Sequence, residues 1–350
     1  MANIAQSIIP IARTRRVFKN HKSSVIGVTV FPNGGRMVTS SDDETLCLWD
    51  LKDGAVLKKM EGHHSSVRAV TISGDGKLIA SGDWNGELIA WDGDTGGSLT
   101  TALEAHSKAI NSLNFSPDSA VLATVSLDKT IKLWRTDTWQ IHGNPIDVGE
   151  EIYCVRYSPS GKLLAIATRN CIQIWDQSIS ECIAKMTTAS YSLAWTPDGT
   201  RLLSGGCNLD PTIREWDTST WKQVGDHWGG HPGTTWIWAL AVNSTGTLLV
   251  SASDSKNVRL WRISDRRVIA VFSHFLPVFC ITFSADGKYI LCGGRDKNVT
   301  EWSIPEGAFL EDTVSFSSFQ SHSISYSISS CPRNLFQTMF KLNMDHGQRV

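Results

Sequence analysis

Histidine and aspartate residues recur along this chain at a fixed spacing. His21 precedes Asp43 by 22 residues, and His106 precedes Asp128 by the same 22 residues. A His–Asp pair can act as a general base or contribute to a metal site, so the pattern could support catalysis. Because the same spacing occurs in two separate parts of the chain, it indicates a repeated structural element rather than one active site.

Other catalytic or metal-binding motifs are missing from the sequence. It contains no Gly-rich phosphate loop, no Ser nucleophile elbow and no His-Glu-x-x-His motif. The 8 cysteines include no Cys-x-x-Cys pair, which argues against a zinc knuckle and against a small disulfide scaffold, and favours reduced thiols inside a cell. We therefore expect no enzymatic activity, no metal and no cofactor.

The charge balance narrows the classes of partner. The sequence has 33 Lys and Arg against 34 Asp and Glu, a net charge of -1, which argues against a dedicated nucleic-acid binder. No apolar run approaches the ~18 residues of a membrane span. These features predict an intracellular protein, in the cytoplasm, the nucleus or both, that binds neither membranes nor small-molecule substrates.

Tryptophan residues define the elements that position the His and Asp side chains. Seven of the 14 tryptophans end short strand-like runs, at intervals of 41 to 45 residues, and stand at Trp49, Trp91, Trp134, Trp175, Trp216, Trp261 and Trp302. Within each interval a turn such as Asn33-Gly34 or Asp75-Gly76 separates two β-rich runs, which is typical of a hairpin. A sustained helical period is absent, so the repeats predict an all-β fold.

Four of these tryptophans are followed by aspartate, as in Trp49-Asp50 and Trp91-Asp92. A repeat of this length with several strands and a Trp-Asp ending closely resembles the WD40-repeat family, over roughly residues 13–302. The resemblance implies a seven-bladed β-propeller in which each blade is a four-stranded antiparallel sheet.

The sequence offers two candidates for the outer strand of the last blade. Residues 13–18 and residues 305–310 both look like outer strands, and in this family the N-terminal segment usually completes the ring, so we expect residues 13–18 to pair there. The predicted domains are an N-terminal lead at 1–12, the propeller at 13–313 and a Ser-rich, disordered tail at 314–350. The basic run from Arg13 to Lys22 could contact an acidic partner, but more often such a run is the solvated face of an edge strand.

The resemblance also assigns the recurring His and Asp to a structural tetrad, in which Trp, Ser, His and Asp are joined by hydrogen bonds within one blade. Repeats 1 and 3 carry it complete, as His21, Ser41, Asp43 and Trp49 and as His106, Ser126, Asp128 and Trp134. Repeat 2 has Asp83 and Asn85 at the Ser and Asp positions, and repeat 6 has Asp254 one place early. Repeats 4 and 5 lack the His, so we expect these blades to be the least rigid.

In this family three positions of each blade project onto one face of the ring, called the top face. They carry an aromatic and basic set here: Arg68, Trp84, Tyr153, Tyr191, Trp236, Trp238, Phe279 and Arg295. Tyr, Trp and Arg are enriched at interface hot spots, so this set predicts a partner-binding surface. The alternative is that some rings fold down to plug the channel or pack between blades.

The leading functional prediction is a non-enzymatic scaffold or adaptor, a monomeric propeller within a complex that presents this face to a protein or peptide. A second hypothesis is a substrate-recognition subunit of a ubiquitin ligase, a chromatin complex or an RNA-processing assembly. The remote third is a propeller enzyme, which would need carboxylates such as Asp42, Glu151 and Asp254 to converge at the channel mouth.

Overall fold

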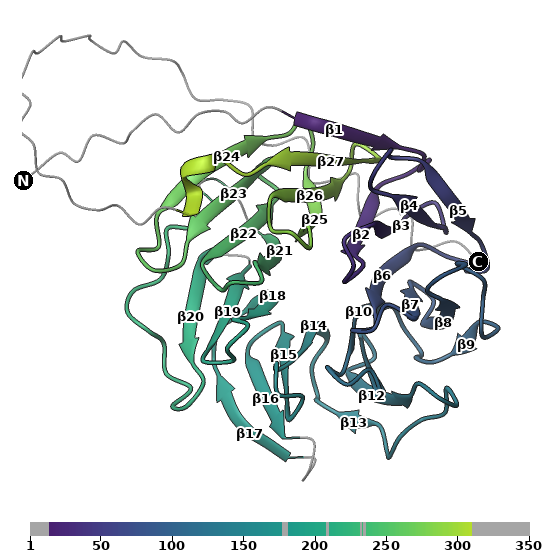
Figure 1. The fold of residues 1–350 in the computed structure, drawn as a ribbon. Coiled ribbons are helices and arrows are strands. Elements are labelled where there is room, and N and C mark those ends of the chain that lie inside the picture. The colour runs from purple at the N-terminus through teal and green to yellow at the C-terminus, as the bar shows by residue number, and fades with distance from the viewer. Residues whose placement is uncertain (1–13, 177–180, 208–209, 232, 234–235, 310–350) are drawn as a thin grey trace, which may run out of the picture. The chain divides into compact units, whose positions relative to one another are not determined.

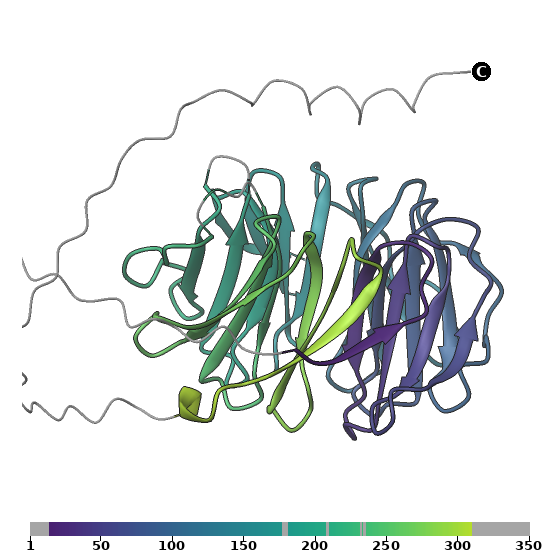
Figure 2. The same ribbon diagram turned by 90° about the horizontal axis from the view of Figure 1, so that it is seen from above.

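The computed structural model describes residues 14–176, 181–207, 210–231, 233 and 236–309. These residues form seven antiparallel sheets and one short 3₁₀ helix, and the sheets stand as blades around a common axis (Figure 1). Seen at right angles to that axis, the strands run between two opposite faces that carry the loops (Figure 2). The seven-bladed propeller predicted from the sequence is confirmed.

In blades 1 to 6 the strands follow the order of the chain from the axis outward. Blade 1 contains β2 (Val25–Val30), β3 (Arg36–Ser41), β4 (Leu46–Asp50) and β5 (Val56–Met60). Blade 2 contains β6 (Val67–Ile72), β7 (Leu78–Asp83), β8 (Glu87–Asp92) and β9 (Leu103–Glu104). Blade 3 contains β10 (Ile110–Phe115), β11 (Val121–Ser126), β12 (Thr130–Arg135) and β13 (Ile146–Asp147). Blade 4 contains β14 (Ile152–Tyr157), β15 (Leu163–Thr168), β16 (Ile172–Asp176) and β17 (Glu181–Met186).

The remaining blades include one sheet of three strands and the sheet that closes the ring. Blade 5 contains β18 (Ser190–Trp195), β19 (Arg201–Gly206) and β20 (Ile213–Asp217). Blade 6 contains β21 (Ile237–Val242), β22 (Leu248–Ser253), β23 (Asn257–Arg262) and β24 (Val268–Ser273). Blade 7 contains β25 (Val278–Phe283), β26 (Tyr289–Gly294), β27 (Asn298–Ser303) and the N-terminal β1 (Thr14–Lys19).

Blade 5 differs from the four-stranded pattern of its neighbours. After β20 the chain makes only isolated bridges, between Trp216 and Gln223 and between Ile213 and Trp228. Trp228 is buried, and its ring centroid lies 5.8 Å from that of Trp261 in blade 6. A packed tryptophan therefore takes the place that a fourth strand has in the other blades.

The N-terminal strand completes the last blade, as the sequence predicted. β1 pairs antiparallel with β27, from Thr14 opposite Trp302 to Lys19 opposite Asn298. The competing segment after Trp302 forms instead the 3₁₀ helix η1 (Glu306–Phe309). Residues 1–13 and the predicted tail at 314–350 lie outside the described residues.

Two arginines of this largely exposed edge strand also support the closure. The side chain of Arg15 pairs with Glu301 at 2.9 Å, and Arg16 lies 3.5 Å from the other carboxylate oxygen of Glu301. Arg16 also donates a hydrogen bond of 2.7 Å to the carbonyl of Leu51 in blade 1. Because Glu301 is buried, loss of both arginines would leave its charge without a partner.

The hairpin turns predicted between the first two strands of each blade are present. One residue of each turn adopts the left-handed conformation, with φ of 72° at Gly34 in blade 1 and 73° at Gly76 in blade 2. In blade 3 the same position is Ser119, which accepts a φ of 61° without being glycine. The turn position therefore favours glycine without requiring it.

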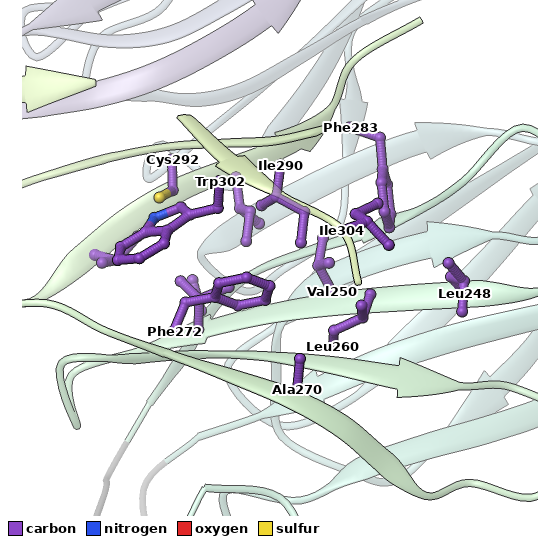
Figure 3. Close-up of a cluster of buried hydrophobic side chains, with 14 of the residues drawn as sticks. Leu248, Val250, Leu260, Ala270, Phe272, Phe283, Ile290, Cys292, Trp302 and Ile304 are labelled. Carbon is purple, nitrogen blue, oxygen red and sulfur yellow. The ribbon is translucent and has the colours of Figure 1, made fainter. Parts of the chain in front are cut away.

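The hydrophobic core lies between the blades. Seven buried clusters each join two adjacent blades, and each contains or packs against one of the seven repeat tryptophans. Between blades 6 and 7, for example, Trp302 packs against Phe272, with Ile290 and Leu260 in the same cluster (Figure 3). Replacing such a buried tryptophan by alanine typically costs about 3–5 kcal/mol, which explains why these residues recur in every repeat.

Candidate partner-binding face

One face of the ring carries two kinds of loop: those that lead into the inner strand of each blade, and those between its second and third strands. Backbone hydrogen bonds join the two loops in four blades. The amides of Asp42, Trp84, Leu127 and Arg295 donate to the carbonyls of Ser24, Ser66, Ala109 and Pro277, at 3.0, 2.9, 3.1 and 3.0 Å respectively. We call this side the upper face; it carries the positions that the sequence assigned to partner binding.

Five aromatic side chains on the upper face form a continuous aromatic band. Tyr153 of β14 stacks on Tyr191 of β18, with ring centroids 4.8 Å apart. Tyr191 makes edge-to-face contacts with Trp236 and Trp238, with 5.4 Å and 4.9 Å between the ring centroids, respectively. Trp238 of β21 stacks on Trp236 at 5.5 Å and contacts Phe279 of β25 at 5.7 Å. The band therefore joins the inner strands of four successive blades.

Arg68 extends the aromatic band across the axis from blade 2. Its guanidinium lies 5.0 Å from the centre of the Trp84 ring, which is 49% exposed. Burial raises the pKa of Tyr191, and the charge of Arg68 and a hydrogen bond to it oppose that rise. Arg68 thus reaches both Trp84 in its own blade and Tyr191 on the opposite side of the ring.

The structure does not bring Arg295 into this arrangement. The backbone amide of Arg295 donates a hydrogen bond to the carbonyl of Pro277, next to the strand that carries Phe279, and the Arg295 side chain is exposed. Among the described residues no aromatic ring lies under its guanidinium. Of the eight residues predicted for partner binding, seven form one connected group and Arg295 stands beside it.

Two exposed apolar residues on this face were missed by the sequence reasoning. Phe275 is 95% exposed and Leu276 is 40% exposed, both in the loop between β24 and β25. The signal was available, because the residue after the tetrad His is polar in three other repeats and is phenylalanine only here. Those counterparts are Lys22, His64 and Ser107.

The tetrad of blade 1 is present, but its hydroxyl comes from a different residue. His21 Nδ1 lies 3.0 Å from Asp43, while its Nε2 lies 2.8 Å from the hydroxyl of Thr39. The indole of Trp49 donates to the same Thr39 hydroxyl at 2.9 Å. Ser41, predicted for this role, instead accepts a hydrogen bond from the backbone amide of Asp43 at 3.1 Å.

The same correction applies to blade 3, where Thr124 replaces Ser126. His106 and Trp134 lie 2.8 and 3.0 Å from the hydroxyl of Thr124, and His106 lies 2.9 Å from Asp128. The reason is the geometry of the hairpin: Trp134 is paired with Leu122, so its ring leans along the strand to the next residue on the same side, which is Thr124. Ser126 lies about 7 Å further along.

Blade 2 contains a hydrogen-bonded tetrad with an aspartate at a different position, which the sequence did not predict. His63 and Trp91 share the hydroxyl of Ser81, at 2.6 and 2.8 Å, and His63 Nδ1 lies 3.3 Å from the carboxylate of Asp83. Asp83 therefore supplies the acid from the position where repeats 1 and 3 have serine. His63, Asp83 and Glu87 each have one potential ligand atom, and these three atoms lie within 4.8 Å of one another, a set of donor types that a divalent cation can accept.

The other blades keep parts of the network. In blade 6, His231 and Trp261 share the hydroxyl of Ser251 at 2.7 and 2.8 Å. The Nδ1 atom of His231 lies 2.9 Å from the hydroxyl of Ser253 and 3.4 Å from that of Ser255. In blade 5, Trp216 donates to Ser204 at 2.9 Å, and the blade has no tetrad His.

The acid–base properties of the blade 1 tetrad are those of a fixed ion pair. Burial alone would lower the pKa of His21, but hydrogen bonds to Asp43 and Cys47 outweigh it and raise the pKa to about 9. The pKa of Asp43 is lowered well below its ordinary value, because its bonds to His21 and Thr45 outweigh burial. A general base at neutral pH needs a pKa near 7, so this pair is suited to structure.

The carboxylates considered for a propeller enzyme belong to three different blades, and each has a local hydrogen-bond partner. Asp42 accepts a hydrogen bond of 2.5 Å from Ser66, and Glu151 accepts one of 3.2 Å from Tyr153. Asp254 accepts one of 3.4 Å from the amide of Trp236. These bonds favour positioning of the upper-face loops over catalysis.

The blades, the closure and the tetrads define a WD40-repeat β-propeller. A family model described as the first β-propeller of IFT122 matches residues 24–227, and the WD domain, G-beta repeat model matches residues 222–262 and 266–303. The chain therefore belongs to the WD40-type β-propeller family represented by the first β-propeller of IFT122. In the described residues no helix is long and apolar enough to cross a membrane.

Relatives among characterised proteins share the propeller sequence at moderate identity. The nuclear distribution protein PAC1 of Arthroderma otae is 26% identical over 310 residues, covering 74% of this chain and 63% of the relative. The pre-mRNA-processing factor 19 homolog 2 of Arabidopsis thaliana is 28% identical over 247 residues, covering 65% and 45%. Protein groucho of Drosophila melanogaster is 25% identical over 273 residues, covering 75% and 36%. The chain thus spans less than two thirds of the length of each of these relatives.

Proposed function

We propose that this protein is a non-enzymatic interaction scaffold that binds a protein or peptide over the upper face. The observation that carries the proposal is the aromatic band, which joins side chains from four blades and is extended by Arg68 and Trp84. Its rings are half-buried, so each keeps an open surface while its neighbours hold it in place. Side chains that are already ordered lose little conformational entropy on binding.

The residue types support protein recognition over small-molecule binding. Trp, Tyr and Arg dominate interface hot spots, where truncation of one side chain typically costs about 2 kcal/mol or more. The aromatic rings also offer polar atoms at their edges, which suits the mixed chemistry of a peptide. The balanced net charge of -1 favours such a partner over nucleic acid.

Affinity capture followed by mass spectrometry tests the proposal. The triple variant Trp236→Ala, Trp238→Ala, Phe279→Ala should lose the partners that the intact chain retains, while both melt cooperatively. A matched control removes three exposed apolar side chains away from the upper face, by Leu57→Ala, Leu99→Ala and Ile183→Ala, and should keep the partners. An unchanged partner list in the band variant, or equal losses in both, would overturn the proposal.

A second candidate is a recognition subunit of a larger assembly, in particular one that processes RNA. The similarity to a relative named pre-mRNA-processing factor 19 homolog 2 favours it. Capture separates this role from a general scaffold, because a recognition subunit retains one stable set of core components besides its variable substrates.

We infer an intracellular location, cytoplasmic or nuclear. The cysteines of the described residues are all free, and six of these seven thiols are buried. Buried unpaired thiols suit a reducing compartment. The name of the nuclear distribution protein relative agrees with this inference.

A further inference from the structure

Phe275 is the most exposed large apolar side chain of the described residues. Only 5% of its surface is covered, since it is 95% exposed, and its neighbour Leu276 is 40% exposed. Scattered exposed apolar residues need no explanation, but here two are adjacent and lie four residues from Phe279 of the aromatic band. Their position extends the apolar part of the upper face to its rim.

Basic turns border this loop on both sides. The amide of His274 donates to the carbonyl of Lys256 at 2.8 Å, and the amide of Arg295 donates to the carbonyl of Pro277 at 3.0 Å. Lys256, Arg295 and the nearby Lys297 all have exposed side chains. Phe275 and Leu276 therefore lie between two turns that present three positive charges to solvent.

The acidic residues of the same turns offset only part of this positive charge. Asp254 and Asp296 are half-buried and accept backbone hydrogen bonds, from Trp236 at 3.4 Å and from Asn298 at 3.3 Å. Two half-buried acids thus stand against three exposed bases. The rim of blades 6 and 7 therefore attracts acidic side chains.

The Phe275–Leu276 loop also lacks a hydrogen bond that holds the corresponding loops of blades 1 and 3. In blades 1 and 3 the tetrad aspartate accepts the amide of the residue after the His, from Lys22 at 2.7 Å and from Ser107 at 3.1 Å. Across the described part of blade 7 no such bond joins Asp296 to Phe275. Because this hydrogen bond is missing, the loop can adjust to a partner at little energetic cost.

We propose that the Phe275–Leu276 loop is a docking site for a peptide segment of another protein, in which apolar residues are flanked by acidic ones. The proposal rests on the proposed function and names the chemistry of its partner. Apolar side chains of the segment pack between Phe275 on the rim and Trp238 and Phe279 of the band. Its carboxylates pair with Arg295, Lys256 and Lys297.

Three fluorescein-labelled decapeptides test this, with fluorescence anisotropy as the readout. The first has a Phe-Leu-Ala-Phe core between glutamates, the second replaces the glutamates by lysines, and the third replaces the core by serines. The intact chain should bind the first at least about tenfold more tightly than either of the others. The variants Phe275→Ser and Arg295→Glu should each weaken that binding about tenfold, and added salt should weaken it further.

Matched controls keep the outcome specific. Leu57→Ser removes a half-exposed apolar side chain from an outer strand, and Lys162→Glu reverses an exposed charge in the β14–β15 turn at the opposite face. Both should bind the first peptide as the intact chain does. If Phe275→Ser binds as well as these controls, or if no peptide or the lysine peptide is preferred, the inference is wrong. The proposed function still stands in that case if the band variant loses partners in the capture experiment.

Discussion

Arg68 lies over the indole of Trp84, with 5.0 Å between the guanidinium carbon and the ring centre, and also acts on Tyr191 across the ring. A cation placed on an aromatic face is attracted by the ring, and the same charge opposes the rise in the pKa of Tyr191. This one side chain therefore couples blade 2 to blade 5 at the upper face.

Removing this cation should loosen the upper face without unfolding the ring. Arg68→Ala is expected to lower the free energy of unfolding by about 0.5–2 kcal/mol, because the cation–π contact is lost. Arg68→Lys, which keeps the charge but not the planar fork, should recover only part of it. Urea unfolding followed by tryptophan fluorescence measures both, and equal stability of all three proteins would contradict the coupling.

The tetrad hydroxyl gives a second prediction. Thr39→Ala should destabilise the protein by about 1–3 kcal/mol, because it leaves the buried His21 and Trp49 nitrogens without a partner. Ser41→Ala loses only a bond to a backbone amide and should have the smaller effect, while Thr39→Ser should be close to the intact chain. Urea unfolding of the three variants decides between them, and a larger loss for Ser41→Ala would restore the assignment made from the sequence.

The blades could be predicted from the sequence, but the tetrad hydroxyl could not, and the exposed Phe275 was missed. The spacing of the seven tryptophans predicted the blades because each one fills a layer between blades, and that role repeats at the length of a blade. The spacing could not choose between Thr39 and Ser41, because both lie on the same side of β3 and only the lean of the Trp49 ring separates them. Phe275 was missed for a different reason: the family pattern assigns no partner-facing position to Phe275 or Leu276.

The ion pair of His21 and Asp43 predicts a dependence of stability on pH. The pKa of His21 is about 9 in the folded protein against an ordinary value of 6.5. Its contribution is therefore fully present below pH 6.5 and is lost as the pH rises through about 9. The contribution of Asp43, whose pKa is lowered, is lost as the pH falls below its ordinary value of 3.8. The stability difference between the intact chain and Asp43→Asn should therefore shrink between pH 6.5 and 9.

His231 provides the internal comparison for this titration. Burial, helped by the charge of Arg259, lowers its pKa to about 3, so it stays neutral where His21 is charged. Its contribution is present above pH 6.5 and is lost as the pH falls towards about 3. In an NMR titration the His21 ring signals should move near pH 9 and the His231 signals should not. Both rings titrating near pH 6.5 would contradict the two assignments.

The closure of the ring gives the last prediction. Glu301 is 4% exposed and pairs with Arg15 and Arg16, so Glu301→Ala should leave two arginines of β1 without their partner. Because the side chains of Arg15 and Arg16 are 40% and 24% exposed, water can solvate them, and the cost should lie below the about 3–5 kcal/mol typical of a fully buried pair. Since β1 has one neighbouring strand only, the loss should appear there first, as faster amide hydrogen exchange in residues 14–19.

The control for this prediction is Lys19→Ala at the end of the same strand, where the side chain is exposed. That variant should exchange at the rate of the intact chain, because no buried charge is left behind. Uniformly faster exchange in all blades of Glu301→Ala would mean that the ring opens as one cooperative unit. Unchanged exchange in residues 14–19 would show that the ladder between β1 and β27 closes the ring without its ion pairs.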